Sequence, residues 1–195
     1  MASSTYYIDS YAKSTNSILT FKNTQNGKSV SFEAFLTDFS QTFSSTWNTD
    51  EVYGRNDPIA TFQGTKRTLT LGWDLPAGNP TVAANNLLNC SVLTQFMYPS
   101  YVDSFNVEEK DKKIISKAPL VKILYANLIR SRTTPDGLLG WIESLSWTPQ
   151  MDMGVFTTGK DIYPKVISLS LTFNVLHQHN LGHLNGSFAA DGFPF

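Results

Sequence analysis

One short segment combines a glycine with basic side chains, as phosphate-binding loops do. Gly64, Thr65 and Lys66 are consecutive. A phosphate loop has the pattern G-x-x-x-x-G-K-[ST] between a strand and a helix, because its backbone N–H groups and its lysine surround the phosphates. Here the lysine follows a threonine, no glycine stands at the upstream spacing, and a strand-like pattern follows where a helix is needed. The segment therefore does not match a phosphate loop.

Three histidines lie close together near the end of the chain, at His177, His179 and His183. Imidazole nitrogen is a common zinc ligand, but a structural zinc site needs four ligands. No second cluster of cysteine or histidine exists to complete such a set. We expect no metal site, and the sequence leaves open whether these histidines bind anything.

Nucleophilic catalysis has little support in the sequence. Cys90, the only cysteine, stands in an apolar segment where a small buried thiol is the usual outcome. There is no G-x-S-x-G motif, and the acidic residues are scattered singly. We expect a protein without catalytic residues and without a cofactor.

The composition favours a folded protein that is covered by partners. Charged residues make up 16% of the 195 residues, below the roughly 25% that is usual for soluble domains. Lys and Arg total 15 against 16 Asp and Glu, so the basic surplus that drives duplex binding is missing. The N-terminal residues lack the pattern of a signal peptide, no apolar run is long enough to span a bilayer, and a single cysteine fits a reducing compartment.

Alternation of apolar and polar residues is the commonest pattern, and it predicts half-buried strands. It is clearest at 165–178, where every second residue from Ile167 to Val175 is apolar and the residues between them are uncharged. Residues 65–74 repeat it with Leu69, Leu71 and Trp73. Residues 140–147 place Trp141, Leu145 and Trp147 on one face, interrupted by Glu143, and residues 119–129 are apolar on both faces.

Three further segments complete the expected elements. Residues 18–32 predict a hairpin that turns near Asn26-Gly27. Residues 33–47 repeat an aromatic residue every four positions, which suits a helix or a strand; their Ser, Thr and aromatic content favours a long or bent strand. Residues 78–98 predict the one helix, which starts at Asn79-Pro80 and ends before Pro99.

The charged segment 51–78 belongs to this β framework. Asn56-Asp57-Pro58 is turn chemistry, because a residue before proline avoids the helical region. We expect a strand, a turn at Gly64 and a second strand, with Arg55 and Arg67 flanking the hairpin. Their guanidinium groups suit either pairs within the chain or a joint between subunits.

The order of these features resembles a known family. Val52-Tyr53-Gly54-Arg55, Asp57-Pro58-Ile59, Gly64-Thr65-Lys66-Arg67 and the helix end at Tyr98-Pro99 are similar to tail-tube-like baseplate proteins of tailed phages, in particular the tube initiator class of contractile-tail phages. The similarity spans roughly residues 30–183 and carries no chemical signature.

The resemblance implies a mainly β fold, an antiparallel sandwich or barrel with one flanking helix. It implies one domain over residues 1–195, with flexible segments at 1–16 and 184–195. Six copies would form a ring at the junction of baseplate and tail tube, seed tube growth and line a channel for DNA. Partners would be further copies, tube proteins and hub proteins within the virion, assembled in the host cytoplasm. The expected subunit-interface residues are Tyr53, Arg55, Asp57, Lys66, Arg67, Phe188, Phe193 and Phe195.

Two other functions remain as alternatives. A carbohydrate- or receptor-binding β-sandwich would use exposed tryptophans as stacking platforms, although the alternation predicts that Trp73, Trp141 and Trp147 are mostly core and leaves Trp47. A small hydrolase would use His177, His179 or His183 beside an acid.

Overall fold

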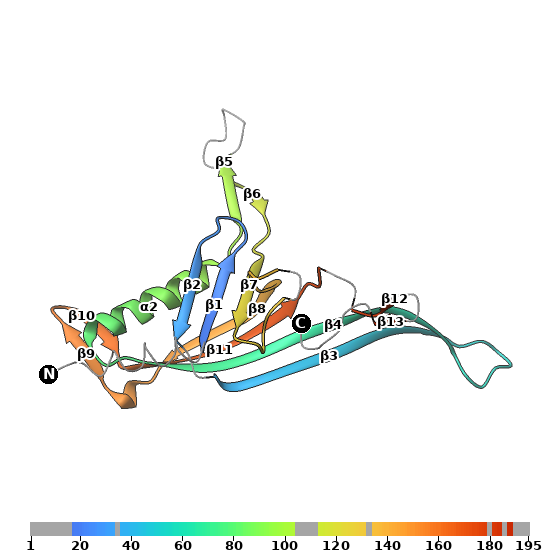
Figure 1. Cartoon of the computed structure of the whole chain (residues 1–195), viewed down its shortest axis with the longest axis horizontal. Helices are drawn as coiled ribbons and strands as arrows, with labels where there is room; N and C mark the ends of the chain where they lie inside the picture. The colour runs from blue at the N-terminus through green and yellow to red at the C-terminus, as the bar shows by residue number, and fades with distance from the viewer. Residues whose placement is uncertain are drawn as a thin grey trace.

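A computed structural model of the chain describes residues 17–33, 36–103, 113–131, 134–178, 181–184 and 187–188. Its centre is a seven-stranded antiparallel sheet in the order β2-β1-β7-β8-β11-β4-β3 (Figure 1). The strands are β1 (Ile18–Asn23), β2 (Ser29–Glu33), β3 (Leu36–Asp50), β4 (Ile59–Pro76), β7 (Val121–Tyr125), β8 (Leu138–Pro149) and β11 (Val166–Val175). The predicted mainly β fold class is confirmed.

Smaller elements surround this sheet. Three two-stranded pairs are β5 (Ser100–Asp103) with β6 (Lys113–Lys117), β9 (Val155–Thr158) with β10 (Asp161–Pro164), and β12 (His183–Leu184) with β13 (Ser187–Phe188). A single turn of 3-10 helix, η1 (Met151–Met153), precedes β9. The α-helix α2 (Pro80–Gln95) lies on the flank, in contact with β2, β9 and β10. No helix of the described residues has the length and apolar character needed to cross a membrane.

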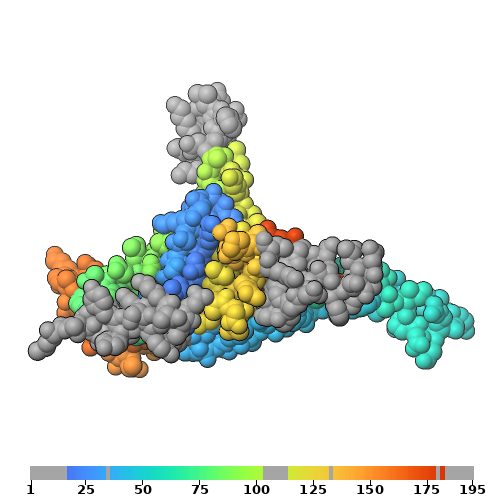
Figure 2. All heavy atoms as spheres, in the orientation of Figure 1, coloured from blue at the N-terminus to red at the C-terminus, as the bar shows by residue number. Residues whose placement is uncertain are grey.

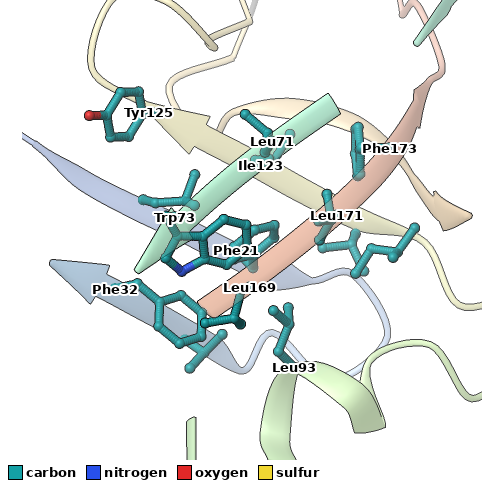
Figure 3. Packing of buried hydrophobic residues seen from close by; sticks show 14 of the residues in the cluster. Phe21, Phe32, Leu71, Trp73, Leu93, Ile123, Tyr125, Leu169, Leu171 and Phe173 are labelled. Carbon is teal, nitrogen blue, oxygen red and sulfur yellow. The ribbon is translucent and has the colours of Figure 1, made fainter. Parts of the chain in front are cut away.

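The core lies between the two ends of the central sheet, which bends back over itself. Phe21 of β1 and Phe32 of β2 pack on Trp73 of β4, with ring centroids 6.0 and 5.8 Å apart (Figure 3). These strands are not neighbours in the sheet, so the contact closes its β1–β2 end over β4. The alternation in β11 is confirmed, because Ile167, Leu169, Leu171, Phe173 and Val175 are all buried on this side.

The helix begins and ends as the sequence predicts. Asn79 caps it, because its Oδ1 accepts a hydrogen bond from the Val82 backbone N–H at 2.8 Å, and Pro80 occupies the first turn. The buried side of α2 carries Ala83, Cys90 and Leu93. Leu93 enters the same core as Trp73 (Figure 3). The helix therefore covers one end of the β core.

The predicted turn at Gly64 is wrong. Residues 59–76 form one uninterrupted strand, and the turn between β3 and β4 is the loop 51–58. At Gly64 the register of the two strands shifts, because Thr46 is paired with Gly64 while the next residue, Trp47, is paired with Phe62. An extra residue on one strand is a β-bulge, so the glycine marks a bulge in place of a reversal.

The predicted shared face of Trp141, Leu145 and Trp147 is also wrong. β8 contains a bulge: β11 Thr172 is paired with Ser144 and Phe173 with Ile142, which leaves Glu143 without a partner. A one-residue insertion reverses which side chains face the core. Trp141 therefore lies on the opposite face from Leu145 and Trp147. Trp141 is 40% exposed and Trp147 is 39% exposed.

Candidate assembly surface

The hairpin of β3 and β4 extends far beyond the core as a two-stranded arm. Figures 1 and 2 show its far half standing clear of the rest of the described molecule. Every residue from Thr42 to Gln63 is exposed on both faces of this ribbon. We call residues 50–58 the tip of the arm, residues 44–49 and 59–65 its shaft, and residues 41–43 and 66–68 its root.

The shaft exposes large apolar side chains. Trp47 and Phe62 are paired across the two strands, with ring centroids 5.2 Å apart and an edge-to-face angle of 63°. They remain 54% and 53% exposed, and Ile59 is 45% exposed. A cross-strand aromatic pair stabilises a hairpin by about 0.5–1 kcal/mol, but an isolated two-stranded ribbon is marginal in water. Burial of these side chains against another surface would therefore stabilise the shaft.

The tip contains three of the predicted interface residues. Tyr53, Arg55 and Asp57 all lie in the loop, and Tyr53 is fully exposed. Gly54 follows it with φ +87°, a left-handed conformation that favours glycine. The loop is closed by the Arg55 backbone N–H, which donates to the Val52 carbonyl at 3.1 Å. This turn holds the tyrosine outward at the end of the arm.

The root contains the other two strand residues of that prediction, on opposite faces. The Arg67 side chain faces the core side, where Nε and Nη2 both donate to Gln41 Oε1 at 3.2 and 2.8 Å. Its guanidinium carbon lies 5.7 Å from the centre of the Phe43 ring. Burial lowers the pKa of Arg67 from its ordinary value. Lys66 is exposed and takes part in none of the described ion pairs.

An open groove runs beside the root, with a volume of about 690 Å³. It begins where β11 stops, because Asn174 is paired with Thr68 and the preceding β4 residues have no β11 partner. Its lining includes Lys66, Trp141, Glu143, Leu176 and His177.

A short hydrogen-bond chain orders one wall of this groove. Thr68 Oγ1 donates to Asn174 Oδ1 at 2.8 Å, and Asn174 Nδ2 donates to Glu143 Oε2 at 2.7 Å. The carboxylate that the β8 bulge places outside the ladder is thereby held by β11. The groove thus joins an exposed indole, a carboxylate and an ammonium group on one surface.

The face of the sheet opposite the core is rich in hydroxyl groups. In β11 it presents Ser168, Ser170, Thr172 and Asn174, as the alternation predicts. The same pairing rows continue it through β3, β4 and β8 with Ser40, Thr42, Thr68, Thr70, Ser144, Ser146 and Thr148. The charged residues on this face of β3, β4, β8 and β11 are Asp38, Lys66, Asp74 and Glu143. On these four strands the face is therefore polar, with one lysine among three carboxylates.

The five strand and loop residues that the sequence singles out thus lie in two places, tip and root. Sequence reasoning missed Phe62, which completes the exposed pair with Trp47; the apolar–polar alternation of residues 60–63 was the available signal. Phe188 belongs to β13, while Phe193 and Phe195 lie outside the described residues. None of these positions is tested as an interface, and all stay predictions.

Catalytic and metal chemistry gain no support from the described residues. They hold no group of three His, Cys, Asp or Glu side chains placed to bind a metal ion. His177 borders the groove, His183 belongs to β12, and His179 lies outside the described part. Burial raises the pKa of the Cys90 thiol to about 11, so it is protonated at neutral pH.

Comparison with known proteins finds similarity only in structure. No family model matches the chain, and no curated protein matches its sequence. Among solved structures, it is similar to the Dit (gp 19.1) protein of phage SPP1, described as a hub of the adsorption apparatus in phages infecting Gram-positive hosts, at 10% identity and a TM-score of 0.39. That match covers 80% of this chain and 49% of the other, so the chain spans about half the length of the SPP1 protein.

A second similar structure is a chain of the anti-feeding prophage baseplate, solved with sixfold symmetry. It matches at 10% identity and a TM-score of 0.32, over 82% of this chain and 88% of that one.

Proposed function

We propose that this chain is a structural subunit of a phage tail, placed in the baseplate at its junction with the tail tube. It forms a ring of like copies, hexameric by the resemblance of its sequence to tube-initiator proteins. The ring presents a template for tube growth and surrounds the DNA channel. Its function has no catalytic step and needs no cofactor.

The observation that carries this proposal is the arm. A ribbon that exposes Trp47, Ile59 and Phe62 and has solvent on both faces is poorly stabilised alone. β3 is also an edge strand of the central sheet along its whole length in the described residues. Exposed edges invite pairing with other chains, and closure into a ring removes them. Assembly would therefore cover the apolar side chains of the arm and pair the free edge of β3.

The hydroxyl-rich face supports the channel in the proposal. Duplex DNA binds tightly where lysine and arginine release its counterions, and binding of that kind would hinder passage. A surface of Ser and Thr side chains keeps water at the wall and offers few cations. We assign to the channel the part of this face that lies away from the root groove, from Ser168 to Thr172 of β11 with the residues paired to them.

The test is direct observation of assembly. Purified protein, alone and mixed with the products of neighbouring genes, is examined by negative-stain electron microscopy and mass photometry. Sixfold rings or short tubes support the proposal. A protein that stays monomeric at all concentrations and never joins a tube contradicts it.

A carbohydrate- or receptor-binding role is the second candidate, because Trp141 and Trp147 are more exposed than the alternation predicts. Trp141 beside Glu143 in the root groove offers an aromatic plane and a hydrogen-bonding carboxylate. Binding to defined glycans on an array, lost on Trp141→Ala and kept on Trp47→Ala, would favour this role over a purely structural one.

A further inference from the structure

We propose that the tip of the arm of one copy binds in the root groove of the next copy. This inference rests on the proposed ring and names the two surfaces that meet in it. The separation of the expected interface residues into tip and root then has a simple reason. Tyr53, Arg55 and Asp57 form one half of a head-to-tail joint, and Lys66 belongs to the other half.

The tip has the form of an anchor. Tyr53 is fully exposed at the end of the arm and is held there by the turn at Gly54. Tyrosine is among the residues that dominate interface energies, when it fills a pocket on the partner. The root groove offers Trp141, Val175 and Leu176 beside polar groups, so it has apolar surface for a ring and hydrogen-bonding groups for its hydroxyl.

The charges of the two surfaces are complementary. The tip carries three carboxylates, at Asp50, Glu51 and Asp57, against one guanidinium group at Arg55. The groove carries Lys66, which suits Asp57, and Glu143, which suits Arg55, while the Arg67 guanidinium is turned to the core side and bound to Gln41. None of the ion pairs among described residues involves Asp57, Lys66 or Glu143, so their charges remain available to another chain. Complementary charges of this kind select a partner and its orientation.

The arm also has a suitable reach. Seven β3 residues, Ser44–Asp50, lie beyond the root. They span about 23 Å at roughly 3.3 Å per residue, and the tip loop extends this to about 30 Å. That length is comparable to the width of a domain of this size, whose radius of gyration is about 16 Å.

Such a contact is heterologous, because the two surfaces that meet are different. Repeating it produces a closed ring when the rotation closes, and an open filament when it does not. Every copy then uses both its tip and its root.

The decisive experiment mixes two singly substituted proteins. Asn56→Cys, an exposed tip residue that leaves Tyr53 in place, and Leu176→Cys are purified separately, combined and oxidised, and the mixture is run on a non-reducing gel. Cys90 is kept, since it is fully buried in the core. A cross-linked dimer that requires both proteins is expected. In the matched control, Ile162→Cys replaces Leu176→Cys. Ile162 is exposed in β10, at the opposite end of the molecule from the arm (Figure 1).

Charge exchange gives an independent measurement. Asp57→Lys and Lys66→Asp are each expected to lower the assembled fraction by about tenfold, and the double variant to recover most of it. Lys160→Asp, an exposed charge change between β9 and β10, is the control and should leave assembly unchanged. Circular dichroism confirms that each variant is folded.

The outcomes separate the two proposals. If rings form but the two cysteines cross-link no better than the control pair, the tip does not bind the root, and the proposed ring stands without this joint. If the unsubstituted protein forms no assembly of any kind, the proposed function itself fails.

Discussion

Arg67 reaches diagonally across the root of the arm to Gln41, and both its Nε and its Nη2 donate to the same amide oxygen, at 3.2 and 2.8 Å. The guanidinium group is buried, at 1% exposure, in the sheet that continues from the core into the arm. This contact fixes where the compact part of the molecule ends. Substitutions of Arg67 and of Gln41 should therefore change the free energy of unfolding by different amounts.

We expect Gln41→Ala to lower the free energy of unfolding by about 1.5–3 kcal/mol, because it removes an acceptor from a buried charged donor. Arg67→Met should cost less, since it removes the charge together with the need for an acceptor. The matched control is Arg55→Met at the exposed tip, which should change stability by less than about 0.5 kcal/mol. Urea unfolding of the three variants measures this order, and equal losses for all three would contradict it.

Two tryptophans in aromatic contacts should behave very differently. Trp73 is fully buried against Phe21 and Phe32, so Trp73→Ala should cost about 3–5 kcal/mol. Trp47→Ala removes an exposed contact with Phe62 and should cost less than about 1 kcal/mol in the monomer. The same Trp47 variant should reduce assembly, as measured by mass photometry. A large loss of monomer stability at Trp47 would show that the shaft is part of the folded core.

Two glycines in strands offer a second contrast. A methyl group on Gly140 would collide with the Asn174 carbonyl and come within 2.7 Å of the Phe173 ring, so Gly140→Ala should cost about 3 kcal/mol or more. A methyl group on Gly64 would meet nothing within 4 Å, and its φ is not in the left-handed region. Gly64→Ala should therefore be nearly neutral. Thermal unfolding followed by circular dichroism distinguishes the two. A large loss of stability for Gly64→Ala would contradict the continuous strand and favour a turn at Gly64.

An acid-sensitive contribution should come from Asp136. Lys22 and Lys122 are directly opposed in β1 and β7, and their ammonium groups lie 3.2 and 3.5 Å from the Asp136 carboxylate. The hydrogen bond and charge of Lys22, followed by the charge of Lys122, lower the pKa of this carboxyl.

A pKa that is lower in the folded state stabilises the fold above the unfolded value, near pH 4, and the stabilisation disappears as the pH falls below it. Asp136→Asn should consequently be less stable than the parent at pH 7 and equal to it near pH 2. The site is exposed, so the difference should shrink in 1 M salt. Denaturant titrations at both pH values check this, and a difference that persists at pH 2 would contradict it.

The Cys90 thiol should be nearly inert in the folded protein. It is fully buried in α2, and burial raises its pKa to about 11, so little thiolate exists at neutral pH. A thiol-reactive dye should label it at the rate of unfolding, and immediately in denaturant. Labelling as fast as a free thiol in native buffer would show that the helix opens readily.

The sequence predicts the elements whose patterns arise from burial on one side. Leu69, Leu71 and Trp73 alternate because one face of β4 lies on the core, and Asn79-Pro80 marks a helix start that needs no distant partner. The bulges at Gly64 and Glu143 are not visible in the same way, because they depend on the partner strand. When alternating residues are counted along the sequence, an inserted residue is counted like any other. The reversal of faces at Glu143, and with it the exposure of Trp141, was missed for that reason.

The arm shows a different limit. Phe39, Phe43 and Trp47 recur with a spacing typical of a buried face, yet exposure rises from partial at Phe39 to more than half at Trp47. Local periodicity shows which side chains are apolar. It does not show whether the surface that covers them belongs to the same chain or to another.

β4 has one further consequence, in the way the molecule bears force. It is the one described strand that runs from the tip of the arm to the far end of the core, and its residues 68–73 are paired on both sides, with β3 and with β11. Tension applied to the tip acts along the strand, so these rows of bonds are loaded together in shear. A pull on the arm would meet the combined resistance of the central sheet, whereas a sideways force at the tip would separate the outer pairs of the arm one after another.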